Sequence, residues 1–199
     1  MVQEQPQTQR WEISWDEDYR LRTSPEVVTR CLRAGVPSLE FVRWRVLETR
    51  PGYCKSLLPI SFPASNQHGV HQAAIMALAV DYTAGTAVGT ILRGFPLIGV
   101  HPQTDGDGAS VWAVGLSIRY QVPSSGDLVL VSQIPEDQQK RIFRRFLSGS
   151  TVLEKIEVSL SSDGLEVATG EMVVFAKQTR KMRPGTAGSV PHPPCSRTS

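Results

Sequence analysis

The sequence predicts an α+β fold in which one curved antiparallel β-sheet wraps around one long central helix. The helix is predicted by the longest apolar stretch of the chain, since residues 69–92 contain no Lys, Arg, Glu or Pro and one acid, Asp81. The sheet is predicted by later segments in which apolar and polar residues alternate, as in half-buried strands. A helix that is apolar all round must be buried, and a sheet needs its apolar face covered, so the two requirements satisfy each other.

Length and composition favour one ordinary globular domain. The chain has 199 residues, 40% hydrophobic and 20% charged, with a net charge of +2. This charge gives no reason to expect a nucleic-acid or membrane partner. Three scattered cysteines fit neither a disulfide framework nor a metal site, and no apolar signal segment opens the chain. We therefore expect a cytoplasmic protein without a metal or other cofactor.

The segments before the central helix follow simple local signals. Residues 1–23 are expected to form a flexible N-terminal segment. Ser24 followed by Pro25 predicts the start of a short helix, and Gly35 predicts its end. Two strands are then predicted, at residues 41–48 and 53–62, with Pro51-Gly52 as the turn between them.

The segments after the central helix are mostly strands. The clearest strand is 112–122, where six apolar residues alternate with small or polar ones. A helix is predicted at 136–147, with acids first and arginines last, as the helix dipole favours. The other expected elements are a short apolar run at 95–100, a loop at 104–108, a strand at 128–134 and a hairpin of 152–160 with 165–177. The single domain is expected to span 24–178, and 179–199 is expected to be a disordered tail.

Asp81 is the residue that breaks the local pattern. An ionised carboxylate is rarely buried without a partner, and Asp is a poor residue for a helix interior. Ala74, Ala77 and Gly85 fall on the same helical face, so small side chains surround the acid. This arrangement leaves room for a ligand or for another backbone. The alternative is a structural Asp paired with an Arg or a backbone amide.

Three patches of sequence together resemble the hotdog-fold thioesterase superfamily. They are Asn66-x-x-Gly69 followed twelve residues later by Asp81, Tyr120-x-x-Pro123-x-x-Gly126-Asp127-Leu128, and residues 163–170 of the last hairpin. The resemblance runs from about Leu39 to Lys177 and is greatest to thioesterase-like domains related to the phenylacetic-acid-pathway thioesterases. The chain departs from the pattern where relatives often carry His-Gly-Gly. It has Gln72-Ala73-Ala74 there, with a histidine one place earlier at His71.

The resemblance implies an acyl thioesterase that acts on a coenzyme A or carrier-protein thioester. A helical carboxylate can activate water or attack the thioester carbonyl, and free amides at the helix start, near Gln72 to Ala74, can stabilise the oxyanion. Asp81 lies about 10–13 Å along the helix from those amides, so one subunit does not bring both to one carbonyl. In relatives the site lies between two subunits, which implies a homodimer or a dimer of dimers.

Two other readings remain open from the sequence. One is a related hotdog dehydratase, isomerase or cyclase of acyl or polyketide intermediates that uses Asp81 for proton transfer. The other is a non-catalytic acyl-binding dimer. The missing glycines favour both of these readings over hydrolysis. The candidate catalytic residues are Asp81, Gln72 and His71. The candidate substrate-binding residues are Asn66, His68, Gly69, Ala73, Ala74 and Gly85, although Asn66 and His71 also suit structural roles as loop-fixing and capping residues.

Overall fold

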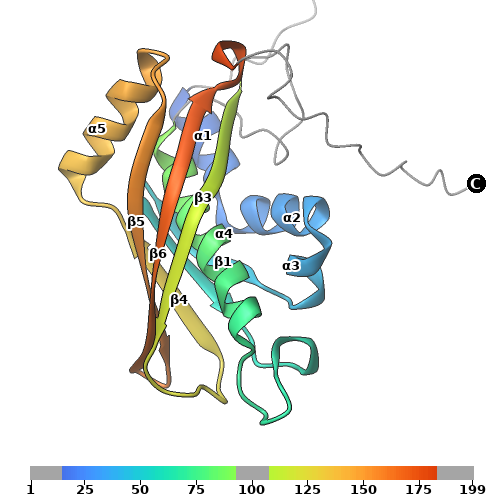
Figure 1. The fold of residues 1–199 in the computed structure, drawn as a ribbon. Helices are drawn as coiled ribbons and strands as arrows, with labels where there is room; N and C mark the ends of the chain where they lie inside the picture. Colours follow the sequence, from blue (N-terminus) through green and yellow to red (C-terminus); the bar gives the residue numbers. More distant parts are fainter. Residues whose placement is uncertain (1–14, 93–107, 183–199) are drawn as a thin grey trace, which may run out of the picture.

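The computed structural model describes residues 15–92 and 108–182, and in them a curved antiparallel sheet wraps around one long helix (Figure 1). The helices are α1 (Trp15–Thr23), α2 (Pro25–Gly35), α3 (Pro37–Phe41), α4 (Ala73–Ile91) and α5 (Glu136–Leu147), with 3-10 turns η1 (Phe62–Ala64) and η2 (Thr179–Lys181). The strands are β1 (Arg45–Arg50), β2 (Tyr53–Leu58), β3 (Ala109–Tyr120), β4 (Leu128–Gln133), β5 (Val152–Ser162) and β6 (Leu165–Gln178). Their order in the sheet is β1-β2-β4-β5-β6-β3, and every neighbouring pair is antiparallel.

Helix α4 is the core element that the apolar stretch predicted. One face of the helix, which includes Met76, Val80, Ala84 and Ala87, is buried. By length and composition α4 would also be able to span a membrane, but 56% of its most apolar window is buried inside the fold. In these residues α4 is the core helix of a wrapped sheet, as Figure 1 shows.

Gly170 allows β6 to approach α4 closely. A Cβ atom added at Gly170 would lie 2.7 Å from Cγ1 of Val80 on α4. Because Val80 is buried in the core and has no free space to move into, we expect Gly170→Ala to lower the free energy of unfolding by about 1–3 kcal/mol. Urea denaturation measures this change. Gly115→Ala is the control, since its Cβ would meet Val173 at 3.4 Å, and an equal loss in both variants would contradict the close-approach argument.

The structure corrects the start of the first predicted strand. Residues 41–48 were expected to be extended, but α3 ends at Phe41 and the strand begins only at Arg45. Val42, Trp44 and Val46 are buried as the alternation requires, yet the first two lie in a turn around Arg43, whose φ is +59°. A tight turn can bury alternate side chains as a strand does, so the pattern alone did not distinguish them.

The other boundaries predicted from the sequence differ less from those in the structure. The second strand ends at Leu58 and is followed by η1, and η2 occupies the first residues of the expected tail. Helix α1 lies inside the segment expected to be flexible, and the Tyr19 hydroxyl donates to the Thr90 carbonyl at 2.8 Å, which ties α1 to the end of α4.

The helix at 136–147 and the hairpin around Ser162-Asp163-Gly164 are confirmed. The apolar run at 95–100, nearly all of the 104–108 loop and residues 183–199 lie outside the described residues.

The two edge strands of the sheet, β1 and β3, differ in what lies beside them. At the β1 edge, the Val46 amide donates to the Thr29 hydroxyl of α2 at 2.9 Å, so α2 covers this edge. At the opposite edge, β3 pairs only with β6 among the described strands. Exposed apolar side chains lie along β3 and the residues that follow it, namely Trp112, Val114, Leu116, Tyr120 and Val122. Within residues 15–92 and 108–182, the β3 edge is therefore the open one.

Candidate functional site

One face of α4 is only half-covered, and it carries the predicted acid. Ala74 is exposed, and Ala77, Asp81 and Gly85 are half-buried, while the positions between them are mostly buried. This spacing of three to four residues is one side of a helix. A Cβ added at Gly85, one turn after the acid, would meet no atom of the described residues within 4 Å, so these residues leave space on this face. The small-residue face predicted from the sequence is therefore present around Asp81.

Asp81 makes no hydrogen bond or ion pair with any residue that the structure describes. Burial is the cause that raises the pKa of its carboxyl above the ordinary value of 3.8. The alternative of a structural Asp held by an Arg or an amide thus finds no partner in the described residues. A half-buried, unpaired carboxyl with a raised pKa is suited to proton transfer or to nucleophilic attack.

The start of α4 supplies two free backbone amides. Gln72 is the N-cap residue, but its side chain makes no capping hydrogen bond, and its own amide donates to the Ala64 carbonyl at 2.9 Å. The next two amides, of Ala73 and Ala74, have no acceptor in the described residues. We expected free amides from Gln72 to Ala74, and the structure narrows this set to the last two. They lie at the positive end of the helix dipole.

The loop before α4 is held by its own hydrogen bonds. The Asn66 side-chain oxygen accepts from the His68 amide at 2.9 Å, and the Asn66 carbonyl accepts from the Gly69 amide at 3.0 Å. Gly69 has a φ of +72°, which glycine adopts without strain. His68 is exposed at this loop. Asn66 and Gly69 therefore have the loop-forming role that the sequence left open for Asn66.

His71 is buried, with 5% of its surface exposed. Its amide donates to the Ser124 carbonyl at 2.9 Å, and its Nε2 donates to the Gly126 carbonyl at 3.1 Å. Burial lowers the pKa of the ring, although the Gly126 carbonyl opposes the shift by favouring the charged form. His71 thus fastens the start of α4 to the turn before β4, a placement that suits positioning rather than contact with a substrate.

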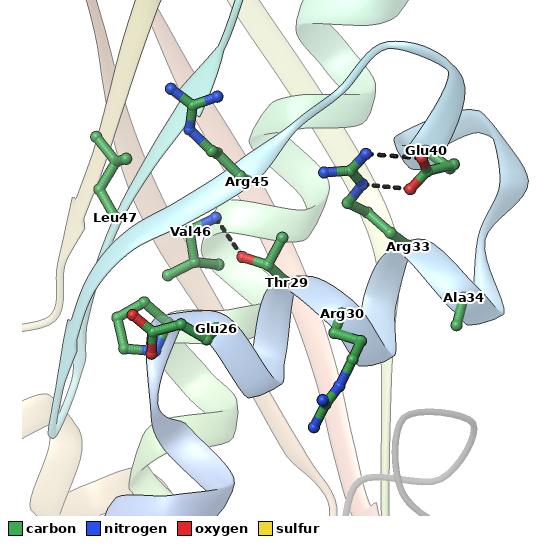
Figure 2. A pocket seen from close by; sticks show the side chains of 10 residues that line it. Glu26, Thr29, Arg30, Arg33, Ala34, Glu40, Arg45, Val46 and Leu47 are labelled. Atoms are coloured by element: carbon green, nitrogen blue, oxygen red, sulfur yellow. Dashed lines mark hydrogen bonds and ion pairs between the residues drawn. The ribbon is translucent and has the colours of Figure 1, made fainter.

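A second surface feature is a pocket of about 760 Å³ between α2 and β1 (Figure 2). Arg33 forms a two-point ion pair with Glu40 there, one contact measuring 2.7 Å. Figure 2 shows Arg30 and Arg45 on opposite sides of the pocket, pointing away from each other. No sequence pattern had indicated this pocket, and none of its lining residues is on α4. The charged side chains of this pocket are spread around its wall, and its lining does not place a nucleophile beside a base.

The acid and the amides are separated along the helix. Asp81 lies eight residues beyond Ala73, which corresponds to about 12 Å of helix. Within one chain, the two groups therefore do not surround one carbonyl carbon. A site that uses both groups needs two chains.

Comparison with solved structures gives the fold. A Shewanella oneidensis protein proposed to be a thioesterase superposes with a TM-score of 0.60 at 18% identity, covering 76% of this chain and 97% of that one. A thioesterase family protein from Silicibacter pomeroyi gives 0.53 at 16% identity, covering 80% and 98%. A thioesterase from Haemophilus influenzae gives 0.52 at 5% identity, covering 84% and 93%. No protein-family model and no curated protein matches the sequence. The chain therefore has the hotdog fold of these thioesterases, as its sequence predicted.

Proposed function

We propose that this protein hydrolyses acyl thioesters at a site built from two subunits. The observation that carries the proposal is the half-buried Asp81, which has no partner in the described residues and lies on a small-residue face of the helix whose first amides are also without an acceptor there. A half-buried acid with a raised pKa and no described structural partner supports a functional role. The thioesterases with the same fold support this class of reaction.

The proposed chemistry assigns one role to each group. Asp81 of one subunit accepts a proton from water while the water oxygen bonds to the thioester carbonyl carbon. The amides of Ala73 and Ala74 of the other subunit donate to the carbonyl oxygen as it becomes an oxyanion. The C–S bond then breaks, and the thiolate leaves and takes up a proton. Direct attack by Asp81, giving an anhydride that water hydrolyses, uses the same groups.

Pairing of two subunits through β3 is part of the proposal. Among the described strands, β3 has a partner on one side alone, and it carries exposed apolar side chains, so it can serve as a template for another strand. A second copy that pairs there antiparallel makes one continuous sheet and a two-fold interface. The two α4 helices then run beside each other, which brings Asp81 of each chain towards the α4 start of its partner.

The substitution Val114→Lys tests the interface. Val114 is 58% exposed at the irregularity in the β3–β6 pairing, and a lysine on an edge strand opposes further pairing. We expect a folded monomer by light scattering at micromolar concentration, with thioesterase activity lost along with the dimer. Leu153→Lys is the control, since Leu153 is 52% exposed on the interior strand β5, and it should remain dimeric. A dimeric Val114→Lys protein would contradict pairing through β3.

The reaction itself is tested by a panel of acyl-coenzyme A and acyl-carrier-protein thioesters. Free thiol is detected by a thiol reagent, and the acyl product is identified by mass spectrometry. Release of thiol with the free acid supports the proposal. An acyl product that has lost water, moved a double bond or gained a ring, with the thioester intact, would instead indicate a dehydratase, an isomerase or a cyclase. A raised Asp81 pKa also suits proton transfer in these reactions. Binding without turnover would indicate an acyl-binding dimer.

A further inference from the structure

Strand β3 holds the first turn of α4 through one tertiary hydrogen bond. The Tyr120 hydroxyl donates to the Ala73 carbonyl at 3.1 Å and joins residues 47 positions apart. Ala73 is also one of the two residues whose amides are free at the start of α4. The Ala73 carbonyl shares its peptide plane with the Ala74 amide, so a bond to this carbonyl restricts the Ala74 amide directly and the Ala73 amide through the backbone of the first turn.

The turn that follows β3 strengthens this attachment. The Ser124 and Gly126 carbonyls accept from the amide and the ring of His71, which lies just before the N-cap residue of α4. The segment from residue 120 to 126 therefore contacts the start of α4 on both sides of Gln72. Of these contacts, only that of Tyr120 comes from β3 itself and reaches into the helix.

We propose that Tyr120 is a positioning residue that sets the direction of the Ala73 and Ala74 amides. The inference rests on the proposed function, because it assigns the oxyanion to those amides. Tyr120 acts through the Ala73 carbonyl and does not itself contact the reacting atoms. Since β3 is also the strand proposed to pair with a second copy, Tyr120 links subunit pairing to the geometry of the anion-binding end of α4.

Tyr120→Phe removes the hydroxyl and keeps the ring. The matched control is Tyr19→Phe, because the Tyr19 hydroxyl donates to the Thr90 carbonyl at the other end of α4, with a distance of 2.8 Å. Both variants thus lose one tyrosine–carbonyl bond to the same helix. Only Tyr120→Phe loses the bond at the end with the free amides.

Two readouts are measured on the full-length protein. The first is hydrogen exchange of the Ile75 and Met76 amides, which donate to the Gln72 carbonyl at 3.0 Å in the first turn. We expect exchange to be about three- to tenfold faster in Tyr120→Phe, the range for loss of one hydrogen bond, and unchanged in Tyr19→Phe. The second is turnover of an acyl-coenzyme A, for which kcat should fall by a similar factor in Tyr120→Phe alone, with KM little changed.

The outcomes separate this inference from the proposed function. Unchanged exchange in Tyr120→Phe overturns the positioning role, whatever the activity. Faster exchange with an unchanged kcat also overturns it, because the amides would then not depend on the bond. A change of oligomeric state in Tyr120→Phe would assign the hydroxyl to the interface instead. If the wild-type protein hydrolyses no thioester, the proposed function fails, and the exchange readout alone decides the role of Tyr120.

Discussion

Asp81→Asn should lower thioester turnover by roughly 10²-fold or more, the scale of a general acid–base group. The substitution keeps the shape of the side chain and removes its ability to accept a proton from water. Steady-state assays with the best thioester of the panel measure the loss. Asp163→Asn is the control, since Asp163 lies in the β5–β6 turn with a φ of +51°, which Asn also tolerates, and its activity should equal that of wild type.

The same variant should be more stable than wild type at pH 7. The folded-state pKa of Asp81 is raised, so folding favours its neutral form, and the stabilisation that this form contributes is lost as pH rises through the folded pKa. Asn carries no charge and avoids this loss. Thermal unfolding should show a higher Tm for Asp81→Asn at pH 7, and the difference should disappear below the unfolded-state pKa of about 3.8.

A lower Tm at pH 7 would contradict the unpaired state of Asp81. It would show that the carboxylate is charged and paired in the assembled protein, the structural alternative that the sequence left open. The pH dependence of turnover adds an independent check. If Asp81 acts as a base, activity should fall as the pH is lowered through the Asp81 pKa, and that acid limb should lie above pH 3.8.

Ala73→Pro should lower kcat by about 10²–10³-fold, the usual effect of removing one oxyanion donor. Ala73 is the first residue of α4, where proline is well tolerated because the amide has no helical acceptor. Gln72 before it has φ −72° and ψ 132°, which suits a residue that precedes proline. Helices α2 and α3 already begin with proline, so the fold accepts this start. Ala73→Gly is the control, since it keeps the amide.

Mixed dimers of Asp81→Asn and Ala73→Pro chains decide whether the two groups act across subunits. In the proposed site, a mixed dimer contains one intact site and one doubly altered site. After an equal mixture is unfolded and refolded, half of the dimers are mixed, and each mixed dimer has one of its two sites intact. The mixture should then show about a quarter of the activity of the same concentration of wild-type dimer. No restoration would mean that each chain uses its own acid and amides, or neither.

The order of elements could be predicted because their signals are local. The apolar stretch of α4, the alternation in β3, the charge order of α5 and the turn at Asp163-Gly164 each lie within one segment. Asp81 was singled out as a candidate for the same reason, because it is the one acid in the apolar stretch 69–92. The start of β1 was not predicted correctly, because burial of Val42 and Trp44 is compatible with both a turn and a strand.

The parts of the site that were missed depend on contacts between distant segments. Tyr120 was noticed in a sequence pattern, but its bond to Ala73 joins positions 47 residues apart. His71 stays a candidate catalytic residue; the sequence did not reveal its burial or its contacts with the Ser124 and Gly126 carbonyls, because the turn at 123–127 creates them. The use of the Gln72 amide by Ala64 is likewise a tertiary contact, so the sequence overestimated the number of free donors by one.

The hydrogen bond from Val46 to Thr29 has a consequence for how many chains can assemble. A sheet with two open edges can add copies without end, which leads to fibrils. Here α2 covers the β1 edge at Val46, so among the described strands the β3 edge is the one left to share. In the proposed dimer, two chains that join through β3 leave at the outer ends of the sheet the β1 edges, each covered by α2. Growth of the sheet then stops at two copies, and a Thr29→Val protein, which frees the Val46 amide, would be the variant to watch for slow polymerisation.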